Sequence, residues 1–167
     1  MKDYQVLSPH ASASAPLQSQ TSPPRRILVV DDDLAIRQLS TEVLIHFGYD
    51  VDTAQDGAAA WQALNTDRYD LLITDQNMPK VTGVELLTKL RAARMTLPVI
   101  MATGTVPKEE FTRCPWLQPA ATLLKPYTIA QLLGTVKEVL HATDGEGVQI
   151  ASPPNWRGKP SAGGLQL

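Results

Sequence analysis

The sequence predicts an α/β fold in which a doubly wound parallel sheet is covered by helices on both faces. Short, continuous apolar runs of strand length recur between residues 26 and 125. Stretches with apolar residues at helical spacing separate these runs, and several runs end on a charged or hydroxyl side chain. Continuous apolar runs are typical of strands buried on both faces, and strict alternation with helices indicates a parallel sheet.

The first strand and helix lie in "RRILVVD" and "DLAIRQLSTEVLIHFG". The strand is a short apolar run that ends on acid. Asp33 is expected to cap the helix, and Gly48 is expected to end it. The helix is predicted from apolar residues at helical spacing, which are Ile36, Leu39, Val43 and Phe47.

The middle of the chain repeats this alternation. "YDVDTA" alternates apolar and polar residues like a strand near the edge of a sheet, and "DGAAAWQALN" predicts a short helix. "YDLLITD" is the third predicted strand. "GVELLTKLRAA" is the next helix, with Val84, Leu87 and Leu90 on one stripe.

The last third contains two further strands, "LPVIMAT" and "AATLLK". The segment between them has Pro115 in its interior, so its helix should be short, about two turns. The closing helix is "TIAQLLGTVKEVLH", in which Thr128 and Gln131 have the spacing of a capping box. Its apolar stripe is Ile129, Leu132, Leu133, Val136 and Leu140.

Two polar segments flank this region. Residues 1–25 are rich in Ser, Ala, Pro and Gln, and residues 143–167 have a similar composition. Such segments bury too little apolar surface to offset the entropy of ordering, so we expect a disordered arm and a disordered tail around one domain at 26–142. The tail is expected to be too short for a DNA-binding or catalytic output domain.

Composition argues against several classes of protein. The formal net charge of -2 does not favour direct nucleic-acid binding, and no apolar run approaches the roughly 20 residues that span a bilayer. The N-terminus lacks the apolar block of a secretory signal. The single cysteine, Cys114, fits a reducing compartment. We therefore expect a cytoplasmic protein without a membrane partner.

Polar side chains follow four of the five predicted strands. They are Asp31 and Asp32 after the first strand, Asp75 after the third, Thr103 after the fourth and Lys125 after the fifth. In open parallel sheets, ligands bind beyond the carboxyl ends of the strands. Three carboxylates, a hydroxyl and an ammonium are therefore expected to converge at one edge.

This combination predicts phosphoryl chemistry. Clustered carboxylates raise one another's pKa unless a cation joins them, and Mg²⁺ prefers oxygen ligands. A carboxylate can also act as a nucleophile and form an aspartyl-phosphate, which Lys125 and the metal would help to neutralise. Thr103 could donate a hydrogen bond to the same group. Taken singly, each residue could equally be a turn residue or a helix cap.

Four segments resemble the motif regions of response-regulator receiver domains from two-component signalling. They are "ILVVDDD", "DLLITDQNMPKVTG", "PVIMATGT" and "LLKPYT", and the resemblance covers about residues 26–142. It implies a flavodoxin-like fold with strand order 2-1-3-4-5. It also implies a phosphorelay signalling protein that assists its own phosphorylation and dephosphorylation, rather than a dedicated enzyme with an organic cofactor.

The resemblance also implies roles for individual residues. Asp75 matches the phosphoacceptor, which takes its phosphoryl group from a sensor histidine kinase or a phosphotransfer protein. Thr103 matches the switch hydroxyl and Lys125 the site lysine, with a cis peptide bond expected between Lys125 and Pro126.

Metal ligands follow from the same motif match. Asp31 and Asp32 match the acidic pair, and Asp32 is expected to contact Mg²⁺ directly. Asp75 is expected to share the ion, and Asn77 matches the position whose backbone carbonyl also binds it.

Three functions remain open from the sequence. The first is a single-domain receiver that switches its contacts with an unknown downstream protein. The second is a phosphatase of the haloacid-dehalogenase type, with Asp31 as nucleophile and Asp33 as acid, although Ala35 and the lack of a later acidic pair depart from that family. The third is a receiver-like binding module that is never phosphorylated.

Overall fold

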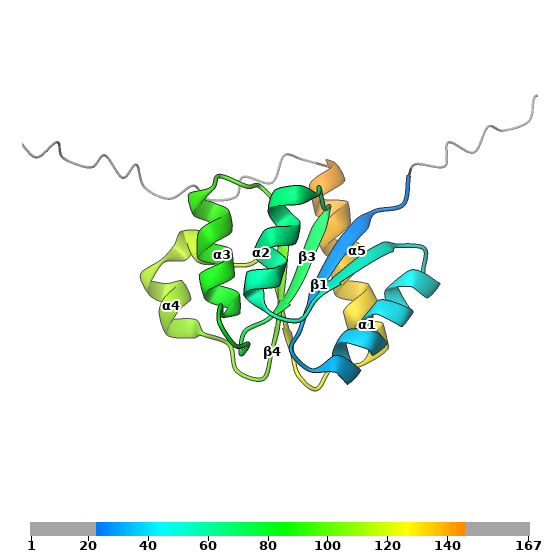
Figure 1. Cartoon of the computed structure of the whole chain (residues 1–167), viewed down its shortest axis with the longest axis horizontal. Helices are drawn as coiled ribbons and strands as arrows, with labels where there is room; N and C mark the ends of the chain where they lie inside the picture. Colours follow the sequence, from blue (N-terminus) through cyan, green and yellow to red (C-terminus); the bar gives the residue numbers. More distant parts are fainter. Residues whose placement is uncertain (1–22, 146–167) are drawn as a thin grey trace, which may run out of the picture.

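The computed structural model describes residues 23–145 and contains one five-stranded parallel sheet between two layers of helices (Figure 1). The strand order is β2-β1-β3-β4-β5, which confirms the predicted fold class and topology. The strands are β1 Arg26–Val30, β2 Asp50–Ala54, β3 Leu71–Asp75, β4 Val99–Thr103 and β5 Ala121–Leu124.

Helices cover both faces of the sheet. One layer contains α2, α3 and α4 with the 3₁₀ turn η1, and the other contains α1 and α5 (Figure 1). The bounds are α1 Leu34–His46, α2 Gly57–Thr66, α3 Gly83–Ala92, α4 Lys108–Arg113, η1 Pro115–Leu117 and α5 Ile129–Gly145.

The register of the sheet brings the ends of the strands to one edge. Val30 pairs with Thr74, so the next residues in these two strands, Asp31 and Asp75, lie at the same level. Asp75 pairs in turn with Ala102 of β4. In this parallel arrangement the predicted site residues of neighbouring strands therefore lie at a common edge of the sheet.

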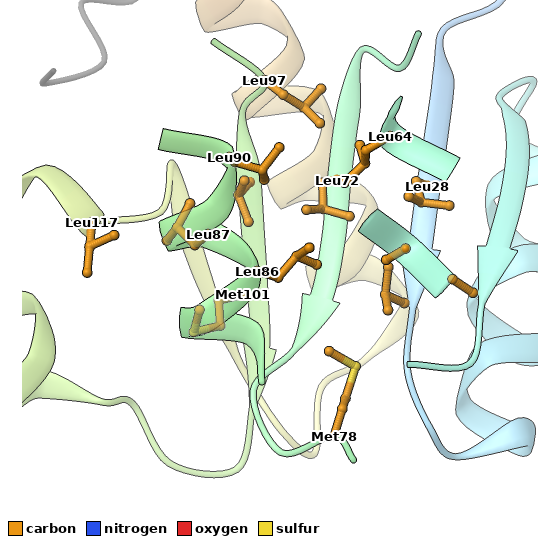
Figure 2. Packing of buried hydrophobic residues seen from close by; sticks show 14 of the residues in the cluster. Leu28, Leu64, Leu72, Met78, Leu86, Leu87, Leu90, Leu97, Met101 and Leu117 are labelled. Carbon is orange, nitrogen blue, oxygen red and sulfur yellow. The ribbon is translucent and has the colours of Figure 1, made fainter. Parts of the chain in front are cut away.

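Two apolar cores hold the layers together. Leu72, Leu86, Leu90 and Met101 are fully buried between the sheet and the layer of α2 and α3 (Figure 2). A second cluster joins the opposite face of the sheet to α5. Full burial of one such side chain contributes about 1.5–3 kcal/mol.

Side-chain caps begin several helices. Asp33 accepts hydrogen bonds from the backbone N–H of Ala35 and Ile36, as predicted. Thr128 and Gln131 form the predicted capping box at the start of α5, with N–H to oxygen distances of 2.8 and 3.2 Å. A second capping box, which was not predicted from the sequence, lies at the start of α3 between Thr82 and Glu85.

The apolar residues of α1 do not all face the core. Ser40 and Leu44 are buried, whereas Leu39 and Phe47 are 56% and 50% exposed. Ile36, Leu39 and Val43 instead line an apolar hollow of about 380 Å³ between α1 and the start of α5. Helical spacing predicted the helix correctly but could not show that its stripe turns toward this seam.

The start of α5 borders the same hollow. Ile129, predicted in the buried stripe of α5, is 49% exposed there. The other residues of that stripe are buried, and Val139 joins them. The hollow also reaches Lys125, so it opens beside the polar edge of the sheet.

The segment after β4 has the predicted short helix. Helix α4 has six residues and ends before Pro115. Trp116 and Leu117 form the 3₁₀ turn together with Pro115, and Leu117 is buried. Phe111 and Leu117 both join the core beside α3, so two apolar anchors hold a helix that has no side-chain cap.

The ends of the described region extend slightly beyond the expected domain. Helix α5 continues to Gly145, past the expected boundary at 142, and Asp144 pairs with Arg25. The remainder of the predicted arm and tail lies outside the described residues. Between residues 23 and 145, no helix is long and apolar enough to cross a membrane.

Candidate functional site

Three carboxylates meet at the carboxyl ends of β1 and β3. Oxygens of Asp31, Asp32 and Asp75 all lie within 4.8 Å of one another. Asp31 and Asp75 are buried, with 4% and 7% of their surface exposed, whereas Asp32 is exposed. Negative charges so close together repel strongly where water cannot screen them.

Lys125 supplies the nearest positive charge. Its Nζ lies 2.7 Å from Oδ2 of Asp31 and 3.5 Å from Oδ2 of Asp75. The peptide bond between Lys125 and Pro126 is cis, as the resemblance implied. One ammonium thus faces two buried carboxylates, while the third carboxylate lies on the solvent side.

This arrangement shifts the pKa values of the central pair. Burial raises the pKa of Asp75, and the charge of Asp31 adds to the effect, while Lys125 and the Gln76 N–H oppose it. Burial disfavours the charged form of Lys125, but the hydrogen bond to Asp31 and the charges of Asp31 and Asp75 outweigh it and raise its pKa. Lys125 therefore stays protonated, and Asp75 carries a charge that its surroundings only partly neutralise.

Backbone contacts fix the orientation of the buried carboxylates. Oδ1 of Asp75 accepts the N–H of Gln76 at 2.7 Å, and Oδ1 of Asp31 accepts the N–H of Asp33 at 3.0 Å. The guanidinium of Arg37 donates to the carbonyl of Asp31 at 2.5 Å. Arg37 was not predicted as a site residue, and its only signal in the sequence is its position on the first turns of the helix after the acidic pair.

Thr103 lies at the end of β4, but its hydroxyl is engaged in the loop that follows. It is fully buried, donates to the carbonyl of Thr105 at 2.9 Å and accepts the Thr105 N–H at 3.3 Å. Asn77 is exposed, two residues beyond Asp75. The structure thus brings together four of the predicted side chains, Asp31, Asp32, Asp75 and Lys125.

The loop after Asp75 closes on itself before α3 begins. The N–H of Gly83 donates to the carbonyl of Gln76 at 3.1 Å, and the side chain of Gln76 accepts the N–H of Val84 at 2.9 Å. A Cβ at Gly83 would lie 2.4 Å from the carbonyl oxygen of Asp75. Only glycine therefore allows α3 to start so close to the tip of β3.

The donor set fits a divalent cation such as Mg²⁺. Every side-chain ligand offered is a carboxylate oxygen, and Mg²⁺ commonly takes one or two carboxylates together with water. Burial, with the neighbouring charge of Asp31, raises the pKa of Asp75, so a cation bound here would stabilise its charged form. Exposed Asp32 leaves one side open to solvent, where the remaining ligands of an ion could lie.

Comparison with known sequences gives a consistent picture. The family model described as the response regulator receiver domain matches residues 27–137. Response regulator MprA of Mycolicibacterium vanbaalenii is 36% identical over 133 residues, which cover 77% of this chain and 57% of that protein. The alkaline phosphatase synthesis transcriptional regulatory protein PhoP of Bacillus subtilis is 34% identical over 131 residues, covering 77% of this chain and 52% of PhoP. The chain spans about half the length of these curated relatives.

Solved structures show the same likeness. Chemotaxis response regulator CheY4 of Vibrio cholerae has a TM-score of 0.64 and 32% identity, covering 70% of this chain and 98% of that one. Response regulator protein TrrA of Thermotoga maritima, solved in complex with Mg(2+)-BeF, has a TM-score of 0.60 and 31% identity. That match covers 69% of this chain and 98% of TrrA.

The shifted pKa of Asp75 predicts that this residue opposes folding at neutral pH. Its pKa is higher in the folded than in the unfolded chain, so its ionised form disfavours the fold. Without divalent cations, Asp75→Asn should therefore raise the Tm at pH 7. A gain of about 1 kcal/mol would correspond to roughly 4 °C.

The pH dependence of this Tm difference tests whether the ionised form of Asp75 causes it. The difference between Asp75→Asn and wild type should vanish below about pH 4, where Asp75 is protonated in both the folded and unfolded states. Asp50→Asn, at an exposed position on β2, is the matched control and should leave the Tm unchanged. A lower Tm for Asp75→Asn at pH 7 would contradict the prediction that the ionised side chain of Asp75 destabilises the fold.

Proposed function

The chain belongs to the response regulator receiver domain family, and from that premise we propose that it takes a phosphoryl group on Asp75. One observation carries the proposal. Asp75 is a buried carboxylate at the tip of β3, it lies 3.5 Å from an ammonium, and two further carboxylates adjoin it. A cluster with too little positive charge is suited to a divalent cation and a phosphoryl group that arrive together.

The proposed donor is a phosphohistidine of a sensor histidine kinase or a phosphotransfer protein. An oxygen of Asp75 forms a bond to phosphorus while the phosphorus–nitrogen bond of the donor breaks. The imidazole nitrogen keeps that electron pair and takes up a proton from water. Lys125 neutralises negative charge on the transferred group, which is electrostatic stabilisation of the transition state.

Mg²⁺ is the proposed cofactor. Asp31, Asp32, Asp75 and the backbone carbonyl of Asn77 would hold it, and when bound it supplies the positive charge that the carboxylate cluster lacks. Asp32 is the proposed direct ligand because it is exposed, whereas Asp31 is already paired with Lys125.

The proposed output is a change in protein contacts. The hydroxyl of Thr103 would leave the carbonyl of Thr105 and donate to the phosphoryl group, which would release the start of the loop before α4. A downstream protein, rather than nucleic acid, would detect this change. We place the exchange in the cytoplasm, following the sequence prediction.

The geometry disfavours the phosphatase alternative. Both carboxylate oxygens of Asp31 are engaged, one with Lys125 and one with the N–H of Asp33. Asp33 uses its own carboxylate to cap α1. A general acid at Asp33 would have to give up this cap, so the pair is poorly placed for that chemistry.

Phosphorylation of Asp75 is tested by intact-mass measurement. With Mg²⁺ and phosphoramidate, a small donor that also has a phosphorus–nitrogen bond, wild type should gain one phosphoryl group. Asp75→Asn should gain none, because its amide cannot act as a nucleophile. Asp50→Asn serves as the control and should be labelled like wild type.

The same assay separates the three candidate functions. A labelled peptide that contains Asp75 supports the proposal. Label on Asp31 would indicate the phosphatase alternative, and an unlabelled wild type would indicate a binding module that is never phosphorylated.

Mg²⁺ binding should stabilise the fold. At ten times its Kd, an ion that binds only the folded chain contributes about 1.4 kcal/mol. Thermal melts of wild type should shift upward with added Mg²⁺, and Asp32→Asn should lose most of the shift. An undiminished shift in Asp32→Asn would mean that Asp32 is not the ligand.

A further inference from the structure

The loop from Asp75 to α3 contains a turn with a backbone conformation that residues other than glycine rarely adopt. Lys80 has a φ of 67°, and the N–H of Val81 donates to the carbonyl of Pro79 at 2.8 Å. A hydrogen bond from residue i+2 to residue i with positive φ between them is a γ-turn of the rare, strained kind. Such a conformation persists only where surrounding contacts maintain it.

One of these contacts is an ion pair with the start of α2. Nζ of Lys80 lies 2.5 Å from Oδ2 of Asp56. The side chain of Asp56 is only 4% exposed, and its other oxygen caps α2 by accepting the N–H of Ala59 at 2.8 Å. The hydrogen bond from Lys80 is the largest cause of the lowered pKa of Asp56. A buried, fully engaged carboxylate thus anchors the Lys80 side chain.

A second contact joins the backbones of the loop and the helix. A Cβ at Gly57, the first residue of α2, would lie 2.4 Å from the carbonyl oxygen of Val81. Glycine is therefore required where the loop passes α2. The ion pair and this close approach fix adjacent residues of the loop, Lys80 at the centre of the strained turn and Val81 at its end.

The remaining contacts fix the ends of the loop. Met78 is buried in the core below the tip of β3 (Figure 2). The carbonyl of Gln76 accepts the N–H of Gly83, which closes the base of the loop. Asn77 lies between these fixed points and is exposed, so its position depends on the anchors on either side.

We propose that Lys80 and Asp56 are a positioning pair that holds the loop of residues 76–83 so that the carbonyl of Asn77 is presented to the metal ion. Neither residue touches the ion. Their ion pair sets the affinity for Mg²⁺ by fixing the loop in its binding conformation before the ion arrives. This inference rests on the proposed function, since it concerns the same metal site.

Electrostatics alone would give the opposite result. Removal of the positive charge of Lys80, on the loop that follows Asp75, should on electrostatic grounds strengthen Mg²⁺ binding. Loss of a positioning contact should weaken it, because binding must then also order the loop. The direction of the change in Kd therefore distinguishes the two effects.

The test is calorimetric titration of the full chain with Mg²⁺. Lys80→Met should raise the Kd about three- to tenfold, which is about 0.7–1.4 kcal/mol. Lys80→Arg can keep the ion pair and should stay near wild type. Lys80→Gly accepts the positive φ but loses the ion pair, so it should bind as weakly as Lys80→Met. Lys137→Met, an exposed charge change on α5, should not alter the Kd.

Labelling of Asp75 by phosphoramidate gives a second readout. At saturating Mg²⁺, Lys80→Met should be labelled at the wild-type rate, while the Mg²⁺ concentration for half-maximal rate should rise. An unchanged or lower Kd for Lys80→Met would overturn the inference, as would wild-type binding by Lys80→Gly. Absence of Mg²⁺ binding by wild type would instead contradict the proposed function itself.

Discussion

The ion pair of Lys125 with Asp31 and Asp75 is the interaction on which the rest of this edge depends. The parallel register of β1 and β3 brings two buried carboxylates together, and burial alone would favour their neutral forms. One ammonium cannot compensate two buried charges and an exposed third. Negative charge therefore remains in excess at this edge of the sheet, and this excess gives the site its proposed affinity for a cation that arrives with a phosphoryl group.

The surrounding elements hold this edge in place. Glycine at position 83 lets α3 start against the carbonyl of Asp75, and Gln76 closes the loop between them. On the far side of the loop, Lys80 joins it to the cap of α2. By contrast, α4 has six residues and no side-chain cap, and it follows the loop in which Thr103 binds Thr105. The site thus adjoins a firmly anchored loop on one side and, on the other, a short helix that no side chain caps.

Much of the fold and the site could be predicted from the sequence, for identifiable reasons. Continuous apolar runs such as that of β3 are typical of strands covered on both faces, and in a parallel sheet the polar residues at their ends share an edge. Local signals also sufficed for the cap at Asp33 and for the break at Pro115. Three other features depend on how distant elements pack, which spacing along the chain does not encode. They are the orientation of the apolar stripe of α1 toward α5, the Arg37 contact and the pairing of Lys80 with Asp56. Helix α5 also continues past its expected end, and there Asp144 pairs with Arg25, a contact between residues far apart in the sequence.

The most direct test is a crystal structure of the full chain with Mg²⁺ and beryllofluoride, a mimic of the phosphoryl group. We expect the mimic on a carboxylate oxygen of Asp75, the ion in contact with Asp32, and Nζ of Lys125 turned from Asp31 toward the mimic. An ion or a mimic seated elsewhere, with Lys125 still paired to Asp31 and Asp75, would contradict the role assigned to this cluster.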